Sequence, residues 1–381
     1  MRLLYFTRDY TTHDHRFLQA FTSRGLEVGY LRLEDGGIAY ETRDVPDGVQ
    51  EVAWSGGKTR AETPEQWLAL MPDFARVLSE YAPDVLYVGP VQSCGFMGAM
   101  AGHRPLAIMS WGSDVLRDSA RSPLWRWMTS YALARADLLV CDSNTVVDRA
   151  RELGDLRDSA ILSFPWGPDL PEGLVADSRG RGRHIRSRLE WAGCRVVLST
   201  RAWEPVYGVD TVLEAFRQAR QVDPDLRLVL LGEGSLGVEF RLYLEEHDLL
   251  GVVHSPGLIA RKEALDYFAA ADIYVSAAHS DGTSVSLLEA MEFGPAIVVT
   301  DIPSNREWIE PGRNGWLAEA GRPDSFSAAL LAASRQPDKE RERYSRRNRK
   351  VLRECAIWEE NADTLVRAVL RISDEHASSR M

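Results

Sequence analysis

Two acidic side chains eight residues apart enclose a run of small polar residues in the stretch SDGTSVSLLEA, residues 280–290. Asp281 opens the run, and Glu289 lies in the apolar segment that follows it. Thr283 and Ser284 are good N-cap residues, so a helix is expected to begin near them. The first turn of such a helix presents backbone N–H groups and the positive end of the helix dipole, which suit phosphate oxygens. The alternative is a capped surface helix with Glu289 in solvent.

The spacing of the two acids separates two kinds of chemistry. If most of 281–289 is helical, the carboxylates lie about 10–12 Å apart at about 1.5 Å per residue. A glycosidase pair that flanks one bond is roughly 5–9.5 Å apart. The longer span suits a nucleotide sugar, with Asp281 on the sugar, the helix N-terminus on the diphosphate and Glu289 on the ribose. Gly282 lets the backbone approach such a ligand closely.

Short apolar runs alternate with helical patterns along the chain, which is typical of β-α units and parallel sheets. Strands are expected at Leu3–Phe6, Val28–Leu33, Val85–Val88, Leu106–Met109, Leu138–Cys141, Ile161–Phe164, Val196–Thr200, Leu226–Leu231, Ile273–Ser276 and Ala296–Thr300. The fold class predicted is α/β, with two doubly wound Rossmann-like domains facing across a cleft. Ligands bind such sheets outside the carboxyl ends of the strands.

The domain boundaries follow from composition. Pro and Gly accumulate between Gly167 and Gly182, which is typical of a linker. We expect an N-terminal domain at 1–170, a linker at 171–190 and a C-terminal domain at 191–355. The tail from Ser327 to Ile372 is expected to be helical throughout, with a last helix at 356–381 that returns to the N-terminal domain.

Charge and composition limit the partners. The net charge of −11 repels nucleic acid at long range, and no nucleic-acid partner is expected. No segment reaches the roughly 18 consecutive apolar residues of a membrane span. The first residues, MRLLYFTRDY, predict a strand rather than a signal peptide, and four scattered cysteines predict reduced thiols. These features favour a cytoplasmic protein and leave its oligomeric state open.

One segment combines arginines with aromatic residues: Arg121–Tyr131 contains Trp125, Arg126 and Trp127. An interfacial membrane helix has this composition. The same stripe occurs more often in core packing, so membrane contact is considered but not favoured.

Several further motifs carry a resemblance to a known family. Glu289-Ala290-Met291 is followed by Gly294–Val298, Arg306–Ile309 and Gly312–Trp316, while Leu230–Gly234 and Pro165–Asp169 form turns in the expected places. The combination resembles the signature of retaining glycosyltransferases of family four, which have the GT-B fold. The resemblance covers most of the chain and implies a hexosyltransferase that takes a nucleotide-diphosphate sugar, UDP-sugar above all, as its substrate and has no cofactor.

On the donor side, the resemblance implies a catalytic role for Asp281, which replaces the family's Glu, and for Arg201 on the phosphates. Tyr207 stands near the position of the family's phosphate-binding Lys; Arg261 or Lys262 is considered as a substitute, and Lys262 is included among the expected donor residues. The turn Gly257, Leu258 and Ile259 corresponds to the family's contact with the nucleobase. The remaining donor residues implied are Gly282, Thr283, Ser284, Val285 and Glu289.

On the acceptor side the sequence departs from the family. Trp111 stands where the family usually has a His, and it can stack on a sugar or donate one hydrogen bond. Asp114 is expected either to cap the next segment or to bind a ligand hydroxyl. After the first strand, His13 or His15 is expected to face the ligand, and Asp14 is included with His13 among the expected acceptor-side residues. The alternative is a helix cap made by Thr12 or Asp14.

The expected reaction is a metal-independent, same-face transfer of the sugar to a hydroxyl of a small polar acceptor. The leaving diphosphate would accept the acceptor's proton, because the sequence offers no glycosidase-like nucleophile. A GT-B epimerase or sugar phosphorylase is the alternative with the same fold. A non-catalytic binder of nucleotide sugars is the alternative from another class.

Overall fold

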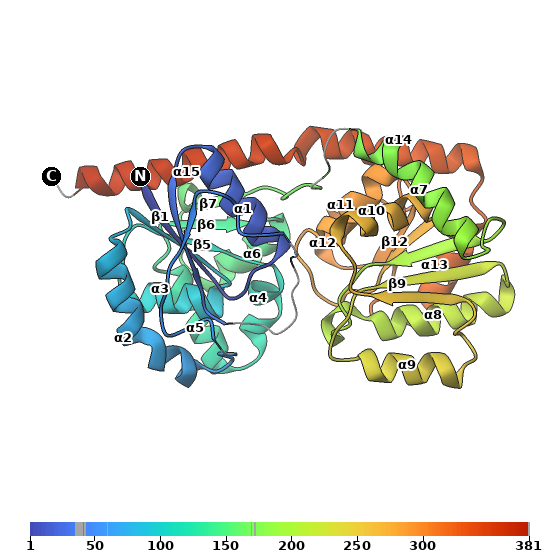
Figure 1. The fold of residues 1–381 in the computed structure, drawn as a ribbon, viewed down its shortest axis with the longest axis horizontal. Helices are drawn as coiled ribbons and strands as arrows, with labels where there is room; N and C mark the ends of the chain where they lie inside the picture. The colour runs from blue at the N-terminus through green and yellow to red at the C-terminus, as the bar shows by residue number, and fades with distance from the viewer. Residues whose placement is uncertain (35–40, 42, 59, 169, 171–172, 380–381) are drawn as a thin grey trace. The chain divides into compact units, whose positions relative to one another are not determined.

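The chain forms two compact units, one of which is built from both ends of the sequence (Figure 1). Unit 1 contains Met1–Pro165 and Glu359–Met381, and unit 2 contains Trp166–Trp358. The computed structural model describes residues 1–34, 41, 43–58, 60–168, 170 and 173–379. Each unit is an α/β domain with a wholly parallel sheet, as the alternating pattern predicts.

Unit 1 holds a seven-stranded sheet in the order β3-β2-β1-β4-β5-β6-β7. The strands are β1 (Arg2–Thr7), β2 (Glu27–Arg32), β3 (Val49–Glu51), β4 (Val85–Gly89), β5 (Leu106–Met109), β6 (Leu138–Cys141) and β7 (Ile161–Ser163). The chain winds outward from β1 in one direction and then from β4 in the other, so the strand order reverses between these two neighbours. Such a switch point is where ligands bind in doubly wound sheets.

Alternate side chains of the unit 1 strands pack on opposite faces of the sheet. Tyr5 and Tyr87 stack with ring centroids 5.4 Å apart and contact Phe21 of the first helix. Leu4 and Phe6 belong to the core on the other face. The helices are α1 (Thr12–Ser23), α2 (Pro64–Tyr81), α3 (Phe96–Ala101), α4 (Ser113–Leu116), α5 (Pro123–Leu133) and α6 (Asn144–Leu153), with short helices η1 (Val91–Gly95), η2 (Asp118–Ala120) and η3 (Asp158–Ala160).

Helix α15 (Trp358–Ser379) completes unit 1 although it follows unit 2 in the chain. It buries an apolar stripe with the period expected for a helix on a core: Ala362, Leu365, Val366, Val369 and Ile372. Arg24 at the end of α1 pairs with Glu359 and Asp363 at 2.9 and 2.6 Å. The amide of Asn361 donates to the carbonyl of Pro165 at 2.8 Å.

Unit 2 holds a six-stranded sheet in the order β10-β9-β8-β11-β12-β13. The strands are β8 (Arg195–Ser199), β9 (Leu226–Leu231), β10 (Val253–Gly257), β11 (Ile273–Ser276), β12 (Ala296–Thr300) and β13 (Trp316–Ala318). The helices are α7 (Leu174–Arg188), η4 (Pro205–Tyr207), α8 (Val209–Val222), α9 (Gly237–Glu246), α10 (Arg261–Ala270), α11 (Val285–Phe293), α12 (Pro303–Arg306), α13 (Pro323–Ser334) and α14 (Asp338–Cys355). The switch point of this sheet lies between β8 and β11.

Much of the segment expected as a linker, 171–190, is instead helix α7, which packs against α10 within unit 2. Gly182, which resembled a chain break, lies in this helix; a Cβ there would meet the Ala269 carbonyl carbon at 2.7 Å. The glycine therefore permits close helix packing rather than a turn. Residues 171–172, and Asp169 in the turn before them, lie outside the described residues.

The tail is helical, as expected, with short breaks between its helices. It forms α13, α14 and α15, the last of which corresponds to the helix expected at 356–381. Pro337, with ψ of 142°, precedes α14 in an extended conformation, and Ala356 ends that helix with φ of −120°. Among the helices that the structure describes, none is both long and apolar enough to cross a membrane.

Candidate active site

The predicted helix at 284–293 forms at the carboxyl end of β11, beside the switch point of unit 2. Helix α11 begins at Val285, and Ser284 is its N-cap with an extended conformation. The Ser284 side chain makes no capping hydrogen bond to the helix. Instead its Oγ accepts a 2.6 Å hydrogen bond from Nη1 of Arg201. The helix start is thus linked to the strand on the other side of the switch point.

Arg201, two residues beyond β8, joins the two sides of the switch point. Its Nη2 donates to Oδ2 of Asp281 at 2.7 Å, and its guanidinium lies 4.2 Å from the ring centroid of Tyr207. Tyr207 therefore does not replace the missing lysine charge but stacks on the one cation beside it. These contacts bring together Asp281, Arg201 and Ser284, as the sequence predicted.

Burial gives the Arg201–Asp281 pair its electrostatic character. Burial raises the pKa of Asp281, while the charge of Arg201 and the Gly282 N–H oppose the rise. For Arg201, burial alone would lower the pKa, but the neighbouring charge of Asp281 leaves it above its usual value. The guanidinium stays charged, and the carboxylate depends on it for compensation.

Hydroxyl groups fix the loop that carries Asp281. The Tyr274 hydroxyl of β11 lies 2.7 Å from Ser286 Oγ, which is 3.0 Å from Ser284 Oγ. On the other side, Trp308 Nε1 donates to Thr283 Oγ1 at 3.3 Å. The first turn of α11 is therefore held from the sheet and from the segment after α12, which leaves it little freedom to move.

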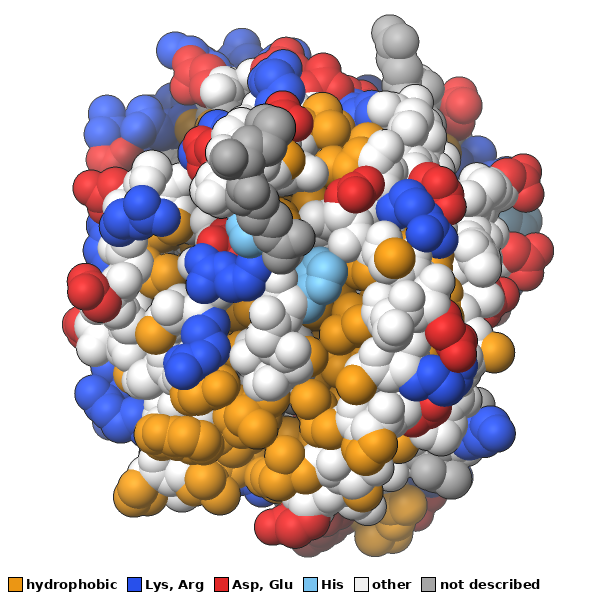
Figure 2. Space-filling view, turned by 90° about the vertical axis from the view of Figure 1, so that its left-hand side faces the viewer, with side chains coloured by type: hydrophobic (Ala, Val, Ile, Leu, Met, Phe, Trp, Pro, Cys, Tyr) orange, Lys and Arg blue, Asp and Glu red, His pale blue; other side chains and the backbone are white. Residues whose placement is uncertain are grey.

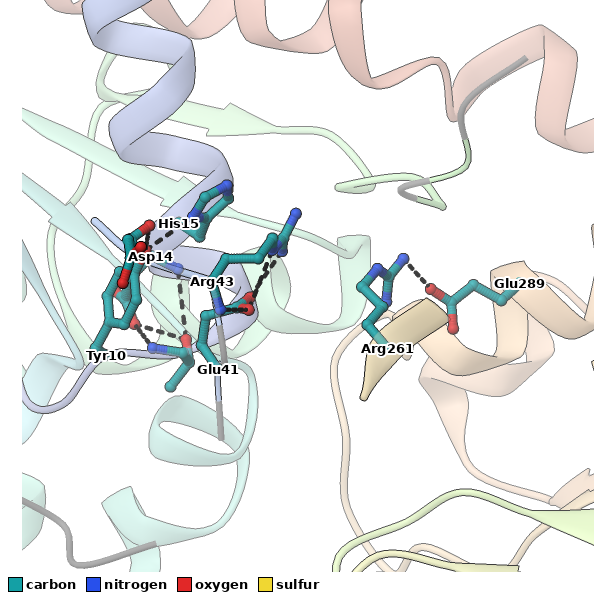
Figure 3. Close-up of polar contacts among 9 residues, drawn as sticks. Tyr10, Asp14, His15, Glu41, Arg43, Arg261 and Glu289 are labelled. Atoms are coloured by element: carbon teal, nitrogen blue, oxygen red, sulfur yellow. Dashed lines mark hydrogen bonds and ion pairs between the residues drawn. The ribbon is translucent and has the colours of Figure 1, made fainter. Parts of the chain in front are cut away.

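Glu289 faces a cation instead of solvent. Its side chain is 6% exposed, and its Oε1 accepts from Nη2 of Arg261 at 2.6 Å (Figure 3). The alternative of a capped surface helix with Glu289 in solvent is therefore wrong. Arg261 opens helix α10, whereas Lys262 beside it is exposed. The structure thus brings Arg261, and not Lys262, to the predicted donor residues; its position just after a strand was the only sequence signal.

The turn at 257–259 follows β10, next to the turn after β9. Gly257 has φ of +81°, which favours glycine, and its carbonyl accepts from Gly232 N–H at 3.1 Å. The N–H of Leu258 lies 3.5 Å from Oε1 of Glu233. Leu258 is exposed and Ile259 is half-buried, so an apolar surface is present where a base could stack.

In unit 1, Asp14 is a structural residue. It is fully buried and forms a capping box with Thr11, whose N–H and Oγ donate to Oδ2 at 2.8 and 2.6 Å. Tyr5 donates to Oδ1 at 2.9 Å. Burial raises the pKa of Asp14 to about 6 against these hydrogen bonds. The cap expected as the alternative is confirmed for Asp14, although Thr11 rather than Thr12 is the N-cap.

The histidines after β1 lie in a polar cluster of unit 1. His13 is half-buried in the first turn of α1. His15 is buried, with Nδ1 2.8 Å from the hydroxyl of Tyr10 (Figure 3). Glu41 accepts from Nη2 of Arg43 at 2.7 Å, and this pairing lowers the pKa of Glu41 even though burial opposes it. The Glu41–Arg43 pair was not predicted from the sequence.

Asp114 and Trp111 have different roles after β5. Asp114 is buried; Oδ1 accepts from Ser110 Oγ at 2.7 Å and from the N–H groups of Trp111 and Val115, and Oδ2 accepts from Val91 N–H at 3.0 Å. The carboxylate of Asp114 is thus occupied by hydrogen bonds within unit 1, although the N-cap of α4 is Gly112 and no side chain caps that helix. Trp111 is half-buried, and its Nε1 has no hydrogen-bond partner among the described residues.

Across the described part of the chain, no group of three or more His, Cys, Asp or Glu side chains is arranged to hold a metal ion. The positive charge near the predicted phosphate position comes from Arg201 and the start of α11. These are groups that bind diphosphates in proteins.

Comparisons with known proteins agree with this arrangement. The family model described as Glycosyl transferases group 1 matches residues 183–351, and the one described as Glycosyl transferase 4-like matches residues 2–143. The amylovoran biosynthesis glycosyltransferase AmsK of Erwinia amylovora is 30% identical over 133 residues, which are 33% of this chain and 33% of that protein. The match thus spans only a third of this relative's length.

Solved structures match over nearly the full chain. HepE of Anabaena in complex with UDP has a TM-score of 0.71 at 16% identity, covering 100% of this chain and 99% of that one. Sucrose-phosphate synthase of Thermosynechococcus elongatus has a TM-score of 0.80 at 14% identity, covering 98% and 99%. The predicted GT-B fold is confirmed. With one glycosyltransferase model matched in each unit, the chain belongs to the family-four type of GT-B glycosyltransferases.

Proposed function

We propose that this chain is a retaining glycosyltransferase that moves a hexose from a UDP-sugar to an acceptor hydroxyl. The observation that carries the proposal is the presence of two partly buried ion pairs at the two ends of the segment 281–289. Asp281 with Arg201 lies at its start, and Glu289 with Arg261 lies near its end. Both are at the carboxyl edge of the unit 2 sheet, where doubly wound domains bind nucleotides.

The donor's diphosphate would lie at the first turn of α11. Arg201 carries five N–H donors in a planar fork, so it can bind phosphate oxygens while keeping part of its contact with Asp281. Backbone N–H groups near Ser284 and Val285 add the favourable end of the helix dipole. Glu289 would accept hydrogen bonds from the ribose hydroxyls, and the turn at 257–259 would contact the base.

Catalysis would rest on stabilising the leaving diphosphate. As the bond between the sugar and the diphosphate loosens, negative charge grows on the phosphate oxygens. Arg201 and the α11 dipole are already oriented toward that charge, which is the form of electrostatic stabilisation that lowers a barrier most. The acceptor attacks from the same face, and its proton passes to the departing phosphate. We propose that this needs no metal ion, so that EDTA leaves turnover unchanged.

The acceptor is proposed to be a small polar molecule with a free hydroxyl, met in the cytoplasm. Trp111 supports an acceptor contact in unit 1, because its indole N–H lacks a partner among the described residues and an acceptor oxygen can satisfy it. The UDP donor is supported by the similarity to HepE, whose structures contain UDP and UDP-glucose.

Glu289→Gln tests the proposal, with Glu292→Gln as the matched control on the same helix. Loss of a charge-assisted hydrogen bond costs about 1.5–3 kcal/mol, so UDP affinity measured by calorimetry should fall roughly ten- to hundredfold. The control should bind UDP as the wild type does. Equal affinities for all three proteins would remove the ribose role of Glu289 and with it the proposal.

Turnover assays separate the remaining reactions. Wild-type protein with UDP-glucose and a panel of hydroxyl acceptors should release UDP and form an α-linked product. An epimerase would convert the donor without acceptor, and a phosphorylase would consume inorganic phosphate. A protein that binds UDP-glucose but neither transfers nor slowly hydrolyses it would be a non-catalytic binder.

A further inference from the structure

Helix α5 in unit 1 is apolar on two opposite faces. Its buried face contains Met128, Ala132 and Leu133, which belong to the unit 1 core. On the other face, Leu124 is 49% exposed and Trp127 is 52% exposed. A helix with apolar residues on both faces is usually buried on both sides. The outer face of α5 therefore needs a partner, and unit 1 supplies none among the described residues.

Neighbouring side chains extend this outer face onto α3. The Trp127 ring contacts Phe96 and Tyr131, with centroids 5.8 and 5.3 Å apart. Met100, one turn beyond Phe96 on α3, is 40% exposed. We define the α3–α5 face by Met100, Leu124, Trp127 and Tyr131. Figure 2 shows hydrophobic side chains gathered at the height of these helices, with Lys and Arg side chains along one border.

On α5 and the residues next to it, the charge is of one sign. Residues 121–135 contain Arg121, Arg126 and Arg135 and no acidic residue, in a chain whose net charge is −11. Two of these arginines lie over aromatic rings: Arg121 is 4.7 Å from the Trp125 centroid, and Arg135 is 3.6 Å from that of Tyr131. Among the described residues, none of the three arginines forms an ion pair with an acid.

We propose that the α3–α5 face docks on an anionic lipid bilayer, with Leu124 and Trp127 inserted among the headgroups and acyl-chain ends. Tryptophan and tyrosine favour this boundary, because their rings are apolar and their polar groups stay hydrated. Arginines with no acid partner attract anionic headgroups, and an interfacial helix binds through both contributions. The proposal goes beyond the transfer reaction and does not depend on it.

The charges favour a bilayer over a second copy of the chain. A two-fold symmetric dimer brings the same patch of both copies together. That arrangement would place the arginines of one α3–α5 face close to those of the other, without acids between them to compensate. An anionic bilayer supplies both an apolar layer for Trp127 and negative charge for the arginines.

Flotation of the full chain with lipid vesicles tests the proposal. Wild-type protein should bind vesicles that contain phosphatidylglycerol more tightly than vesicles of phosphatidylcholine alone, and added salt should weaken the binding. Leu124→Ser/Trp127→Ser should lower partitioning to both kinds of vesicle at least about tenfold. Arg121→Gln/Arg126→Gln should lower binding to the anionic vesicles about 25-fold, at about fivefold per charge, and leave phosphatidylcholine binding unchanged.

The matched control is Val238→Ser/Leu242→Ser on α9, where both side chains are exposed outside this face. It should partition as the wild type does. Absence of wild-type binding to the anionic vesicles, or an equal loss in the control, would overturn the proposal. A dimer by light scattering that the Leu124/Trp127 variant dissociates, without vesicle binding, would assign the face to a second copy. If the Leu124/Trp127 variant fails to fold, the Arg121/Arg126 variant tests the proposal instead. Both arginines are exposed and have no acidic partner among the described residues, so their replacement should not affect folding.

Discussion

At the scale of single residues, the Arg201–Asp281 pair holds an arginine ready for phosphate and an aspartate ready for a sugar hydroxyl. Asp281 is half-buried and would be protonated more easily without a neighbouring cation, whereas Arg201 is half-buried and keeps its charge. Each group compensates the other while no phosphate is bound. The arginine is thus oriented before the donor arrives, and its charge favours the ionised form of the aspartate, which can accept a hydrogen bond from a sugar hydroxyl.

Asp281→Asn should lower kcat about ten- to hundredfold with little change in UDP affinity. The amide keeps the shape of the side chain but loses the charge-assisted hydrogen bonds to the sugar and to Arg201. Initial rates with varied UDP-glucose measure kcat and KM separately. Asp301→Asn is the control, because Asp301 pairs with Arg306 on the exposed surface of the same unit. A change confined to the KM of the acceptor would give Asp281 a different role.

Asp14 stabilises unit 1 by an amount that decreases as pH rises. Its pKa of about 6 in the folded chain lies above the ordinary value of 3.8 for an aspartate, so the folded chain binds the proton more tightly than the unfolded chain. The contribution of Asp14 to the free energy of unfolding is fully present below about pH 4 and is lost as pH rises through about 6. Relative to Asp14→Asn, the wild type should lose about 1.4 kcal/mol of unfolding free energy between pH 5 and 7.5.

Urea unfolding at the two pH values measures this loss. Asp73→Asn is the control, because hydrogen bonds from Arg76 and Ser55 lower the pKa of Asp73 to about 2, far below the tested range. Its difference from the wild type should stay nearly constant. If the difference in unfolding free energy between the wild type and Asp14→Asn is also the same at both pH values, burial does not raise the pKa of Asp14.

At the scale of elements, the start of α8 fixes the loop after β11. Gly208 is the N-cap of α8 with φ of +58°, and a Cβ there would lie 2.2 Å from the carbonyl oxygen of Ala277. The N–H of His279 donates to the carbonyl of Val206 at 2.8 Å. The loop that carries Asp281 is therefore packed against backbone, and its position does not depend on flexible side chains.

Gly208→Ala should destabilise unit 2 by about 2 kcal/mol or more, because a positive φ and a backbone clash both oppose the methyl group. In calorimetry the unit 2 transition should fall by roughly 4–8 °C. Gly193→Ala is the matched control, since no atom lies within 4 Å of its added Cβ. Equal melting temperatures for the two variants would show that the loop yields easily.

The accuracy of sequence-based prediction differed between elements for physical reasons. The central strands are buried on both faces and appear as continuous apolar runs, so they were predicted. The strands that were missed, β3, β10 and β13, are at sheet edges and only partly buried, so they lack such runs. Helix α7 was missed because a glycine that allows close packing looks, in sequence, like a glycine that ends a helix.

In the candidate site, too, some features were predicted from the sequence and others were not. Asp281 and Glu289 were predicted from their spacing in one motif, and Arg201 was predicted from the family resemblance. The partner of Glu289 could not be chosen between Arg261 and Lys262, because one residue of helix rotation turns a side chain from the site to solvent. Asp114 accepts a hydrogen bond from the N–H of Val91, which is distant in sequence, so only the structure reveals that its oxygens are occupied.

At the scale of the whole molecule, unit 1 depends on a helix that follows unit 2 in the chain. Helix α15 buries an apolar stripe in unit 1 and is tied by Arg24, Asn361 and Arg371, the last donating to the carbonyl of Ser159 at 3.0 Å. It is therefore part of the unit 1 fold and not an appended tail.

Leu365→Ala should destabilise unit 1 by about 3–5 kcal/mol, because the side chain is fully buried and its removal leaves a cavity. Leu370→Ala on the same helix is the control; Leu370 is 38% exposed and should cost less than about 1 kcal/mol. Hydrogen exchange should report faster opening of the unit 1 strands and unchanged exchange in unit 2. Faster exchange in unit 2 alone would contradict the assignment of α15 to unit 1.

The position of α15 also has a consequence for biosynthesis. A ribosome makes the strands of unit 1 first, but their last covering helix emerges only after all of unit 2 has been translated. Until then the nascent first half exposes apolar surface that α15 later covers, and it relies on other contacts or on a chaperone to avoid aggregation. Slowing translation late in the message should therefore lengthen the time for which the newly made protein is vulnerable.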